Sequence, residues 1–271
     1  MLKVAGMARS TYYYRIKPSQ EKYKKERLRL KELYQNHKGR YGYRRMRAAL
    51  CHEGFVISHK TVRKLMKEEG LKCRIRQARK NYFKPSPELS ASPNLLNREF
   101  KAEAPFTKGV TDVTEFRVGK EKVYVSALLD LYDGAVLSMV FSTKNNTDLV
   151  MSMFERMPES ISSLIENMLI HSDQGILYRT VRYHEFITRH NIVQSMSHRG
   201  NCYDNALVES FFGTFKAETI RIEPITTIEG LAETLKSYAI YYNRERIKST
   251  LGYKSPFQYR RDNGYEKYTY L

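Results

Sequence analysis

The 271-residue sequence contains no tryptophan and only three cysteines, Cys51, Cys73 and Cys202. The cysteines have no partner at CxxC spacing and do not combine with nearby histidines into a zinc-finger pattern, so reduced thiols are expected. His184 and His190 are six positions apart, whereas the HExxH arrangement needs two histidines four positions apart on one helix face. The sequence therefore offers no recognisable zinc site.

Long apolar segments are also missing. No stretch approaches the roughly 20 apolar residues that cross a bilayer, and residues 1–20 lack the apolar core of a secretory signal peptide. No basic amphipathic helix stands next to an apolar span, which argues against a membrane-surface protein. We expect a soluble, cytoplasmic protein with no membrane partner.

Acidic residues are scarce in the first third of the chain. Residues 1–100 hold 26 Lys and Arg but only 8 Asp and Glu, whereas residues 101–271 hold 21 of each kind. The formal net charge of +18 therefore belongs entirely to the first third. A basic excess confined to one region indicates a phosphate-binding module beside a neutral one. The pattern favours DNA as the partner, and a cytoplasmic DNA-binding protein has access to the nucleoid.

The basic region has the pattern of small helical modules. Residues 4–16 resemble the end of a helix-turn-helix, and a charged helix is expected over about 20–36. A stronger signal is a pair of helices over Tyr43–His52 and Ser58–Glu69, the second with apolar side chains on one face and cations on the other. We predict that residues 1–72 form a helical DNA-binding region. Its candidate DNA-binding side chains are Arg44, Arg45, Lys60, Arg63, Lys64 and Lys67.

A helical bundle with solvated lysines would show the same amphipathic pattern, and the regional charge favours DNA binding over it. Residues 73–107 are basic, contain the Pro/Ser segments 84–87 and 90–93, and have no sustained hydrophobic period. We interpret residues 73–107 as a linker that can follow a phosphate backbone.

After residue 107 the pattern changes to short apolar strands, which predict an antiparallel meander with a tight turn at Asp133-Gly134. Helices and strands then alternate, which predicts parallel additions to the same sheet. We expect an α/β fold over residues 108–220, with a mixed five-stranded sheet flanked by helices. Residues 221–271 are expected to form a helical extension of this core. The expected meander strands are Val110–Val118, Lys122–Leu131 and Ala135–Thr143.

Three carboxylates lie at positions where the surrounding sequence predicts burial or a functional site. Asp112 lies inside the first apolar strand, where a buried charge is costly unless it is paired or bound to a metal ion. Asp173 follows a strand that a parallel topology would place beside the first, at the edge where sites collect. Glu209 lies early in a helix whose apolar residues would hold it against the sheet. Each acid alone fits a turn, cap or salt bridge, as Asp133 fits the hairpin turn, but the three together indicate a site.

Three oxygen donors with no His or Cys nearby are the ligand set expected for Mg²⁺. Two such ions can activate an attacking hydroxyl and stabilise the departing oxygen in an in-line displacement at phosphorus. Glu209, Gly213 and Lys216 share one helix face, so Lys216 is expected to reach DNA phosphates next to the metal ions. The predicted chemistry is phosphodiester cleavage and transfer.

Three segments carry a resemblance to a known family: Val110-Thr-Asp-Val-Thr-Glu-Phe116, His171-Ser-Asp-Gln-Gly175 and the stretch Ser195–Phe212. They closely resemble the OrfB transposases of bacterial insertion-sequence family three. The 35 residues between Asp173 and Glu209 match the D,D(35)E spacing of that family. The resemblance extends to the helix-turn-helix region and to the tail between residues 242 and 256, and so covers nearly the whole chain.

This resemblance implies a retroviral-integrase-like core of the RNase H type and the activity of a DNA transposase. Mg²⁺-dependent cleavage at the ends of the insertion sequence would be followed by attack of the freed 3′-hydroxyl on another phosphodiester. Asp112, Asp173 and Glu209 would be the catalytic residues and ligands of two Mg²⁺ ions, which Mn²⁺ can replace. A mobile loop over His198–Cys202 is expected to close over the DNA end, with Arg199 as a DNA contact.

The resemblance also implies partners. Paired ends imply a homo-oligomer on DNA, and the family implies OrfA as a partner or as an upstream fusion. One departure concerns the Trp that the family usually has shortly before the first Asp, where this chain has Lys108-Gly109. That Trp is not a metal ligand, so the departure bears on packing more than on chemistry.

Two other interpretations remain open. A non-catalytic DNA-binding regulator of transposition would use the basic region and keep the core as a scaffold, although a scaffold does not require an Asp within a buried strand. An RNase H-like nuclease would share the metal chemistry without joining strands, although a nonspecific nuclease has little need for helix-turn-helix modules.

Overall fold

The computed structural model describes residues 23–74, 92–97, 99–157, 161, 163–198 and 205–266. The chain divides into two compact units, Met1–Ile75 and Arg76–Leu271. The helix-turn-helix end expected at residues 4–16 lies outside the described residues. The two units are taken in turn.

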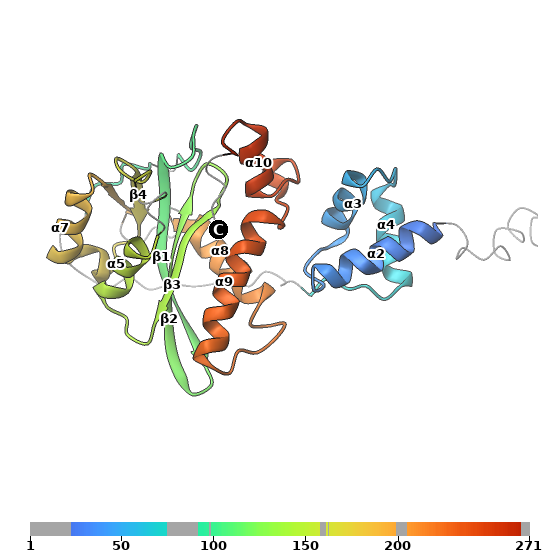
Figure 1. Cartoon of the computed structure of the whole chain (residues 1–271), viewed down its shortest axis with the longest axis horizontal. Helices are drawn as coiled ribbons and strands as arrows, with labels where there is room; N and C mark the ends of the chain where they lie inside the picture. Colours follow the sequence, from blue (N-terminus) through green and yellow to red (C-terminus); the bar gives the residue numbers. More distant parts are fainter. Residues whose placement is uncertain are drawn as a thin grey trace, which may run out of the picture. The chain divides into compact units, whose positions relative to one another are not determined.

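In the described part of the first unit, three helices pack around a small apolar core (Figure 1). These are α2 (Lys24–Asn36), α3 (Tyr43–His52) and α4 (His59–Glu68). The expected helix pair is confirmed as α3 and α4. Ser58 caps α4 by accepting a hydrogen bond from the Thr61 N–H at 3.1 Å. The buried side chains come from all three helices: Leu30, Leu33, Met46, Leu50, Val62, Leu65 and Met66.

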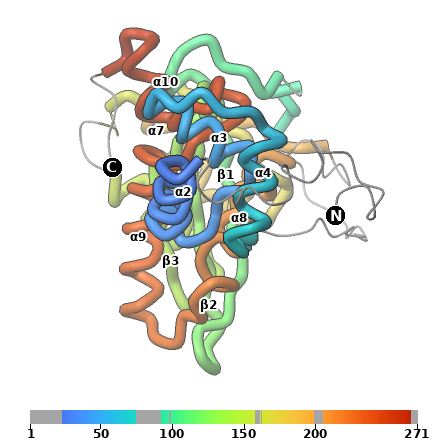
Figure 2. The backbone as a smooth tube through the Cα atoms, turned by 90° about the vertical axis from the view of Figure 1, so that its right-hand side faces the viewer, coloured from blue at the N-terminus to red at the C-terminus, as the bar shows by residue number. Residues whose placement is uncertain are grey.

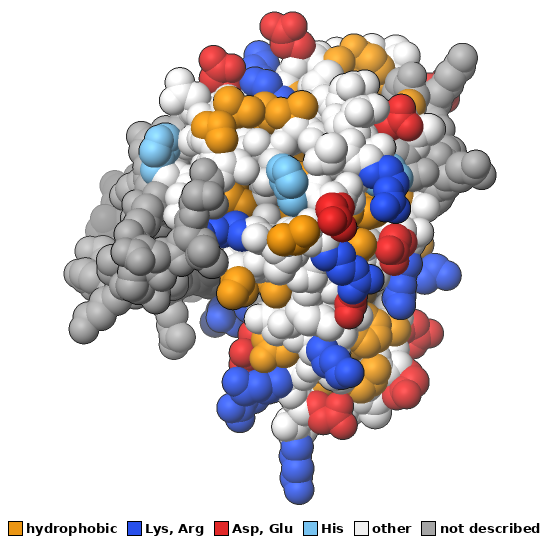
Figure 3. Space-filling model, turned by 90° about the vertical axis from the view of Figure 1, so that its left-hand side faces the viewer, with side chains coloured by type: hydrophobic (Ala, Val, Ile, Leu, Met, Phe, Trp, Pro, Cys, Tyr) orange, Lys and Arg blue, Asp and Glu red, His pale blue; other side chains and the backbone are white. Residues whose placement is uncertain are grey.

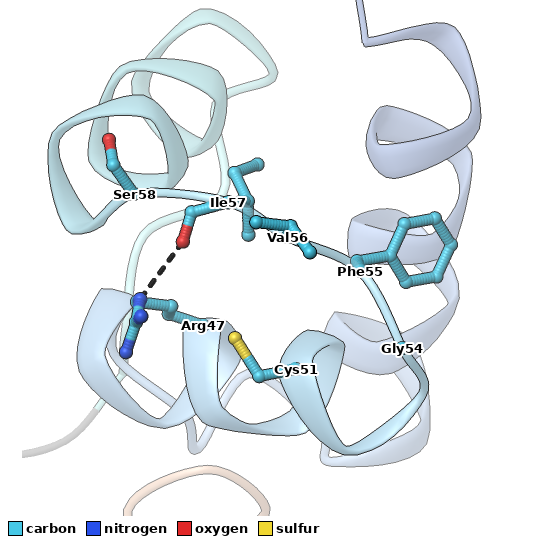
Figure 4. Close-up of a pocket in the computed structure, with 7 residues that line it drawn as sticks. All are labelled: Arg47, Cys51, Gly54, Phe55, Val56, Ile57 and Ser58. Carbon is cyan, nitrogen blue, oxygen red and sulfur yellow. Dashed lines mark hydrogen bonds between the residues drawn. The ribbon is translucent and has the colours of Figure 1, made fainter.

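The connection between α3 and α4 is stabilised by a glycine turn and a hydrogen bond. Gly54 adopts φ 87° after the end of α3, a conformation that a residue with a Cβ seldom takes. Arg47 of α3 donates from Nε to the carbonyl oxygen of Ile57 at 2.9 Å, across the open pocket shown in Figure 4. Val56 is left fully exposed on this connection. The turn therefore sets the angle between the two helices, as a helix-turn-helix requires.

The second unit is built on one mixed sheet with the strand order β3-β2-β1-β4-β5. β1 pairs antiparallel with β2, β2 pairs antiparallel with β3, and β4 and β5 are added in parallel beside β1. This is the predicted meander with two parallel additions. The strands are β1 (Lys108–Val118), β2 (Glu121–Asp130), β3 (Val136–Ser142), β4 (Leu169–Ser172) and β5 (Val193–Met196).

Helices cover both faces of the sheet, and each face has its own apolar core (Figure 1). On one face lie α5 (Thr147–Glu155), the 3₁₀ turn η1 (Ile176–Arg179) and α7 (Val181–Arg189). On the other face lie α8 (Ala206–Glu218) and α9 (Ile228–Arg244). Figure 2 shows α9 running alongside β3. Among the described residues, no helix is long and apolar enough to cross a membrane.

The described part of the expected linker is not a linker. Leu96, Ala102 and Phe106 are buried, and the Ser195 Oγ of β5 accepts hydrogen bonds from the N–H groups of Leu95 (2.9 Å) and Leu96 (3.0 Å). Expecting a linker over residues 73–107 was therefore wrong for its later part. Isolated apolar residues in a Pro/Ser-containing segment show no period, yet they can cover the edge strand of a sheet.

The C-terminal segment is fastened to the sheet by buried polar side chains. The Asn243 amide at the end of α9 pairs with the Val136 N–H at 2.8 Å and with the Val136 C=O at 2.9 Å, as a neighbouring strand would. Arg260 of α10 (Pro256–Asp262) binds Asp133 and Asp130 at the turn after β2. Asp133 accepts the Ala135 N–H, as a turn residue does, but it also forms an ion pair that was not predicted.

Candidate active site

Asp112 lies in the middle of β1, opposite Ala127 of β2. Its side chain is half-buried, and its Oδ1 accepts a hydrogen bond from the Val113 N–H at 2.8 Å. Burial, followed by the nearby Asp173, raises the pKa of Asp112 to about 8, although the Val113 N–H and Lys216 act in the opposite direction. The strand thus holds a carboxyl group in surroundings that disfavour its negative charge.

The sheet register places Asp173 at the same level as Asp112. Val110 pairs with His171 in the parallel ladder of β1 and β4, and each Asp lies two residues beyond its member of that pair. Asp173 Oδ1 accepts the Gly175 N–H at 2.8 Å, and a Cβ at Gly175 would lie only 2.7 Å from this oxygen. The turn therefore needs glycine to hold Asp173 as it does. Burial raises the pKa of Asp173, against the effect of the Gly175 N–H.

Glu209 reaches this region because α8 crosses β1. The Phe215 ring packs edge-on against the Phe116 ring at 5.6 Å between centroids. Lys216 Nζ donates to Thr114 Oγ1 at 2.7 Å, two residues from Asp112 on the strand. Glu209 stands two turns earlier on the helix and is the most exposed of the three acids. Partial burial and Asp173 raise the pKa of Glu209.

The three carboxylates act on one another electrostatically. Asp173 and Glu209 both raise the pKa of Asp112, and Asp173 also raises that of Glu209. Within the described ranges, no three His, Cys, Asp or Glu side chains converge closely enough to form a complete metal site. The donor chemistry nevertheless fits a hard dication, because all three groups offer oxygen and because a nearby positive charge would offset their mutual repulsion.

Two buried side chains next to the acids were not singled out from the sequence. Tyr178 of η1 lies beneath β1, 3.4 Å from the Thr111 hydroxyl, and burial followed by Asp112 raises its pKa well above the usual range. His171 of β4 is fully buried and bonded through both ring nitrogens, to Ser195 at 2.9 Å and to Ser197 at 3.1 Å. No sequence period marked Tyr178, whereas His171 belongs to the quoted segment before Asp173.

Lys216 is held beside the acids. Its ammonium donates to Thr114 Oγ1 and, at 3.1 Å, to the Glu115 carbonyl oxygen, and it lies 4.7 Å from the centre of the Phe116 ring. Burial lowers its pKa, and Asp112 opposes that effect. The structure therefore places a cation next to Asp112, as helix geometry suggested. Contact of Lys216 with DNA stays a prediction.

The remaining candidate DNA-binding residues lie on the first unit, apart from Arg199, which is outside the described residues. Arg44 is exposed over the Tyr43 ring, and Arg45 lies over the Tyr41 ring. The exposed side of α4 carries Lys60, Arg63, Lys64 and Lys67. Of these four, only Lys64 has an ion-pair partner among the described residues, Glu68 at 3.7 Å.

Four acids of the first unit form ion pairs with cations of α2. Arg27, Arg29 and Lys31 of α2 bind the following acids: Glu32, Glu53, Glu68 and Glu69. The cations at the start of α4 are thereby left uncompensated. In the second unit, by contrast, the face drawn in Figure 3 shows Lys and Arg interspersed with Asp and Glu, in agreement with the neutral balance of residues 101–271.

Comparison with known proteins covers both units. The model of an HTH-like domain matches residues 21–79, and two models of an integrase core domain match residues 102–202 and 190–256. The integrase core is an RNase H-like fold that is generally metal-dependent. A helix-turn-helix domain joined to such a core implies DNA binding.

Individual relatives span most of the chain. It is 39% identical to the putative transposase InsK for insertion sequence element IS150 of Escherichia coli strain K12, over 96% of this chain and 92% of that protein. It is 32% identical to the transposase for insertion sequence element IS904 of Lactococcus lactis subsp. lactis strain IL1403, over 91% of this chain and 98% of that protein.

Among solved structures, the fold is similar to a chain of the simian T-cell lymphotropic virus intasome in complex with PP2A regulatory subunit B56 gamma. The TM-score is 0.51 and the identity 17%, over 78% of this chain and 69% of that chain. The mixed sheet, the HTH-like domain and the extent of the sequence similarity agree with one another. The chain therefore belongs to the transposases of insertion-sequence family three, which are DNA transposases with an HTH-like domain and an integrase catalytic core.

Proposed function

We propose that Asp112, Asp173 and Glu209 are the catalytic carboxylates of this transposase and that they hold two Mg²⁺ ions. The observation that carries the proposal is the placement of Asp112 and Asp173 at one level of adjacent parallel strands. Glu209 is near enough to raise the pKa of Asp112, and Asp173 raises the pKa of both other acids. Carboxylates that disfavour one another's charge are well suited to binding a dication. Mn²⁺ is expected to replace Mg²⁺, since both favour oxygen ligands.

The reaction has two steps: hydrolysis, which breaks one phosphodiester bond, and transfer, which breaks one phosphodiester bond and forms another. Water first attacks the phosphorus at an end of the insertion sequence, and the bond to the 3′-oxygen breaks. The freed 3′-hydroxyl then forms a bond to a phosphorus of target DNA, whose own 3′-oxygen leaves. Bound Mg²⁺ would activate the attacking oxygen and stabilise the leaving one. The chain itself positions Asp112 on β1, Asp173 directly after β4 and Glu209 on α8. It also holds Lys216 beside Asp112, where it can contact a DNA phosphate.

DNA recognition is assigned to the first unit. In a helix-turn-helix the second helix lies in the major groove and the first crosses the backbone, which here means α4 and α3. The uncompensated cations Lys60, Arg63 and Lys67, together with Lys64, support this orientation, and Arg44 and Arg45 of α3 would contact phosphates. Arg199 is proposed as a further DNA contact. Association with the nucleoid would follow from this DNA binding.

Assembly on DNA follows from the substrate. Two ends must be cut and joined together, so we propose that a homo-oligomer forms on paired ends. OrfA is proposed as a partner or an upstream fusion, since the described residues contain no long leucine heptad that would serve as a zipper.

The test is strand transfer in vitro with labelled ends of the insertion sequence. Asp112→Asn, Asp173→Asn and Glu209→Gln should each lower the rate at least about a thousandfold while DNA binding persists, because charge at the site is lost and the folded surface is not. Glu115→Gln is the matched control. Glu115 is on the same strand as Asp112 but is exposed and paired with Lys122 at 3.2 Å, so its variant should keep wild-type activity.

The outcomes separate the possible activities. Near-normal transfer by any one of the three variants would refute the site assignment. Metal-dependent cleavage without joining would indicate a nuclease, and binding of the ends with no metal-dependent chemistry would indicate a regulator.

A further inference from the structure

A buried ion pair lies at the far end of the helix that carries Glu209. Glu218, the last residue of α8, is fully buried. Its carboxylate accepts hydrogen bonds from Arg246 Nε and Nη2 at 2.9–3.1 Å and from the Tyr238 hydroxyl at 2.9 Å. Tyr238 is on α9, and Arg246 follows the end of α9, with its guanidinium 5.1 Å from the centre of the Tyr242 ring.

Stability alone does not account for this arrangement. A carboxylate at the C-terminal end of a helix is opposed by the helix dipole. A buried ion pair generally contributes little compared with apolar side chains of the same volume, because both charges lose their hydration. What such a pair does provide is a fixed position of the two side chains relative to each other, since the bidentate geometry of an arginine and a carboxylate tolerates little displacement.

We propose that Arg246 and Tyr238 are positioning residues that fix α8 through Glu218 and thereby set where Glu209 and Lys216 meet the Asp112 side of the site. This inference rests on the proposed role of Glu209 as a metal ligand. Neither positioning residue touches DNA or metal in the proposed reaction. They act only through the placement of the helix.

The packing of α8 shows why a directional contact is needed. Its buried side chains against the sheet and α9 include Val208, Phe211, Phe212 and Phe215, and apolar contacts of this kind have no preferred direction. A helix advances 1.5 Å per residue, whereas Mg²⁺ requires its ligands at about 2.0–2.1 Å. A shift of one residue along α8 would therefore remove Glu209 from a shared metal ion. The hydrogen bonds of Glu218 oppose such a shift.

The fold contains a matched comparison. Arg260 is also buried and also binds carboxylates, Asp130 at 2.8 Å and Asp133 at 2.6 Å. Its partners lie at the turn after β2 and not on α8. Replacing either arginine by lysine keeps the charge and loses the bidentate contact, so both substitutions should destabilise the fold by similar amounts, but only the one at Arg246 should move α8.

The experiment compares Arg246→Lys, Tyr238→Phe and Arg260→Lys in the full chain, well below the melting temperature of each. Binding of Mn²⁺, measured by electron paramagnetic resonance, should weaken about tenfold in Arg246→Lys, as expected when support behind a metal ligand is lost. The single-turnover rate of strand transfer should fall by a similar factor, with affinity for DNA unchanged. Tyr238→Phe should show the same effects to a smaller degree, and Arg260→Lys should show neither.

Equal Mn²⁺ binding and transfer rates in Arg246→Lys, Tyr238→Phe and Arg260→Lys would overturn the inference. If Arg246→Lys does not fold, Tyr238→Phe decides, because it removes one hydroxyl and keeps the buried ring. Glu209→Gln is run alongside. Wild-type activity in that variant would refute the proposed site, whereas an inactive Glu209→Gln beside a fully active Arg246→Lys and Tyr238→Phe would refute only the positioning role.

Discussion

Asp112 illustrates how the proposed catalytic site lowers the stability of the folded protein. Its carboxyl group lies in a strand whose neighbours are largely buried, and burial and Asp173 raise its pKa to about 8. A destabilising buried charge of this kind is tolerated at functional sites when the surrounding structure holds the residue in place. Because the Val113 N–H binds Oδ1, the side chain keeps its orientation whether or not it is charged.

We therefore predict that Asp112→Asn raises the stability of the protein in EDTA while it abolishes strand transfer. Asparagine keeps the shape and the acceptor for Val113 but carries no charge. The melting temperature should rise by roughly 2–4 °C, which corresponds to about 1 kcal/mol for a domain of this size, in a calorimetric scan. Mg²⁺ should raise the melting temperature of the wild type and leave that of the variant nearly unchanged. A lower melting temperature of the variant in EDTA would contradict the argument.

Elements with a local signal were predictable from the sequence. The alternation of β1, the Asp133-Gly134 turn and the amphipathic pattern of α4 each follow from neighbours within a few residues, and Asp112 stood out because a charge interrupts an apolar strand. Glu218 with Arg246 and Asn243 with Val136 gave no such signal, because their partners are 28 and 107 positions away. Leu96 and Phe106 were taken for linker residues for the same reason.

The Asn243 contact makes a prediction about how α9 is held on β3. Asn243→Leu leaves the N–H and C=O of Val136 buried without partners, which costs about 1–3 kcal/mol for each unsatisfied group. The melting temperature should fall by roughly 5–10 °C. Asn263→Leu is the control, because the Asn263 amide binds the Tyr259 carbonyl at an exposed position. An equal loss in both variants would show that the buried pairing contributes nothing specific.

At the scale of the whole molecule, the net charge is distributed unevenly along the chain. The first third carries the entire net charge of +18, and residues 101–271 are neutral. Within the first unit, cations of α2 pair with Glu53, Glu68 and Glu69, and α4 keeps an excess of positive charge. Neutralisation of phosphates by lysine and arginine releases counterions, so the salt dependence of binding counts the contacts that a given surface makes.

Replacing Lys60, Arg63, Lys64 and Lys67 together by glutamine should lower affinity for duplex DNA carrying an end of the insertion sequence. It should also reduce the slope of log K against log salt by about 3–4, since each phosphate contact contributes about 0.9. Fluorescence anisotropy at several salt concentrations measures both quantities. The control removes the same number of charges from exposed positions of the second unit: Lys120, Lys144, Arg189 and Lys236. If the control lowered the slope as much as the α4 variant, DNA binding would depend on the net charge of the protein and not on the helix-turn-helix.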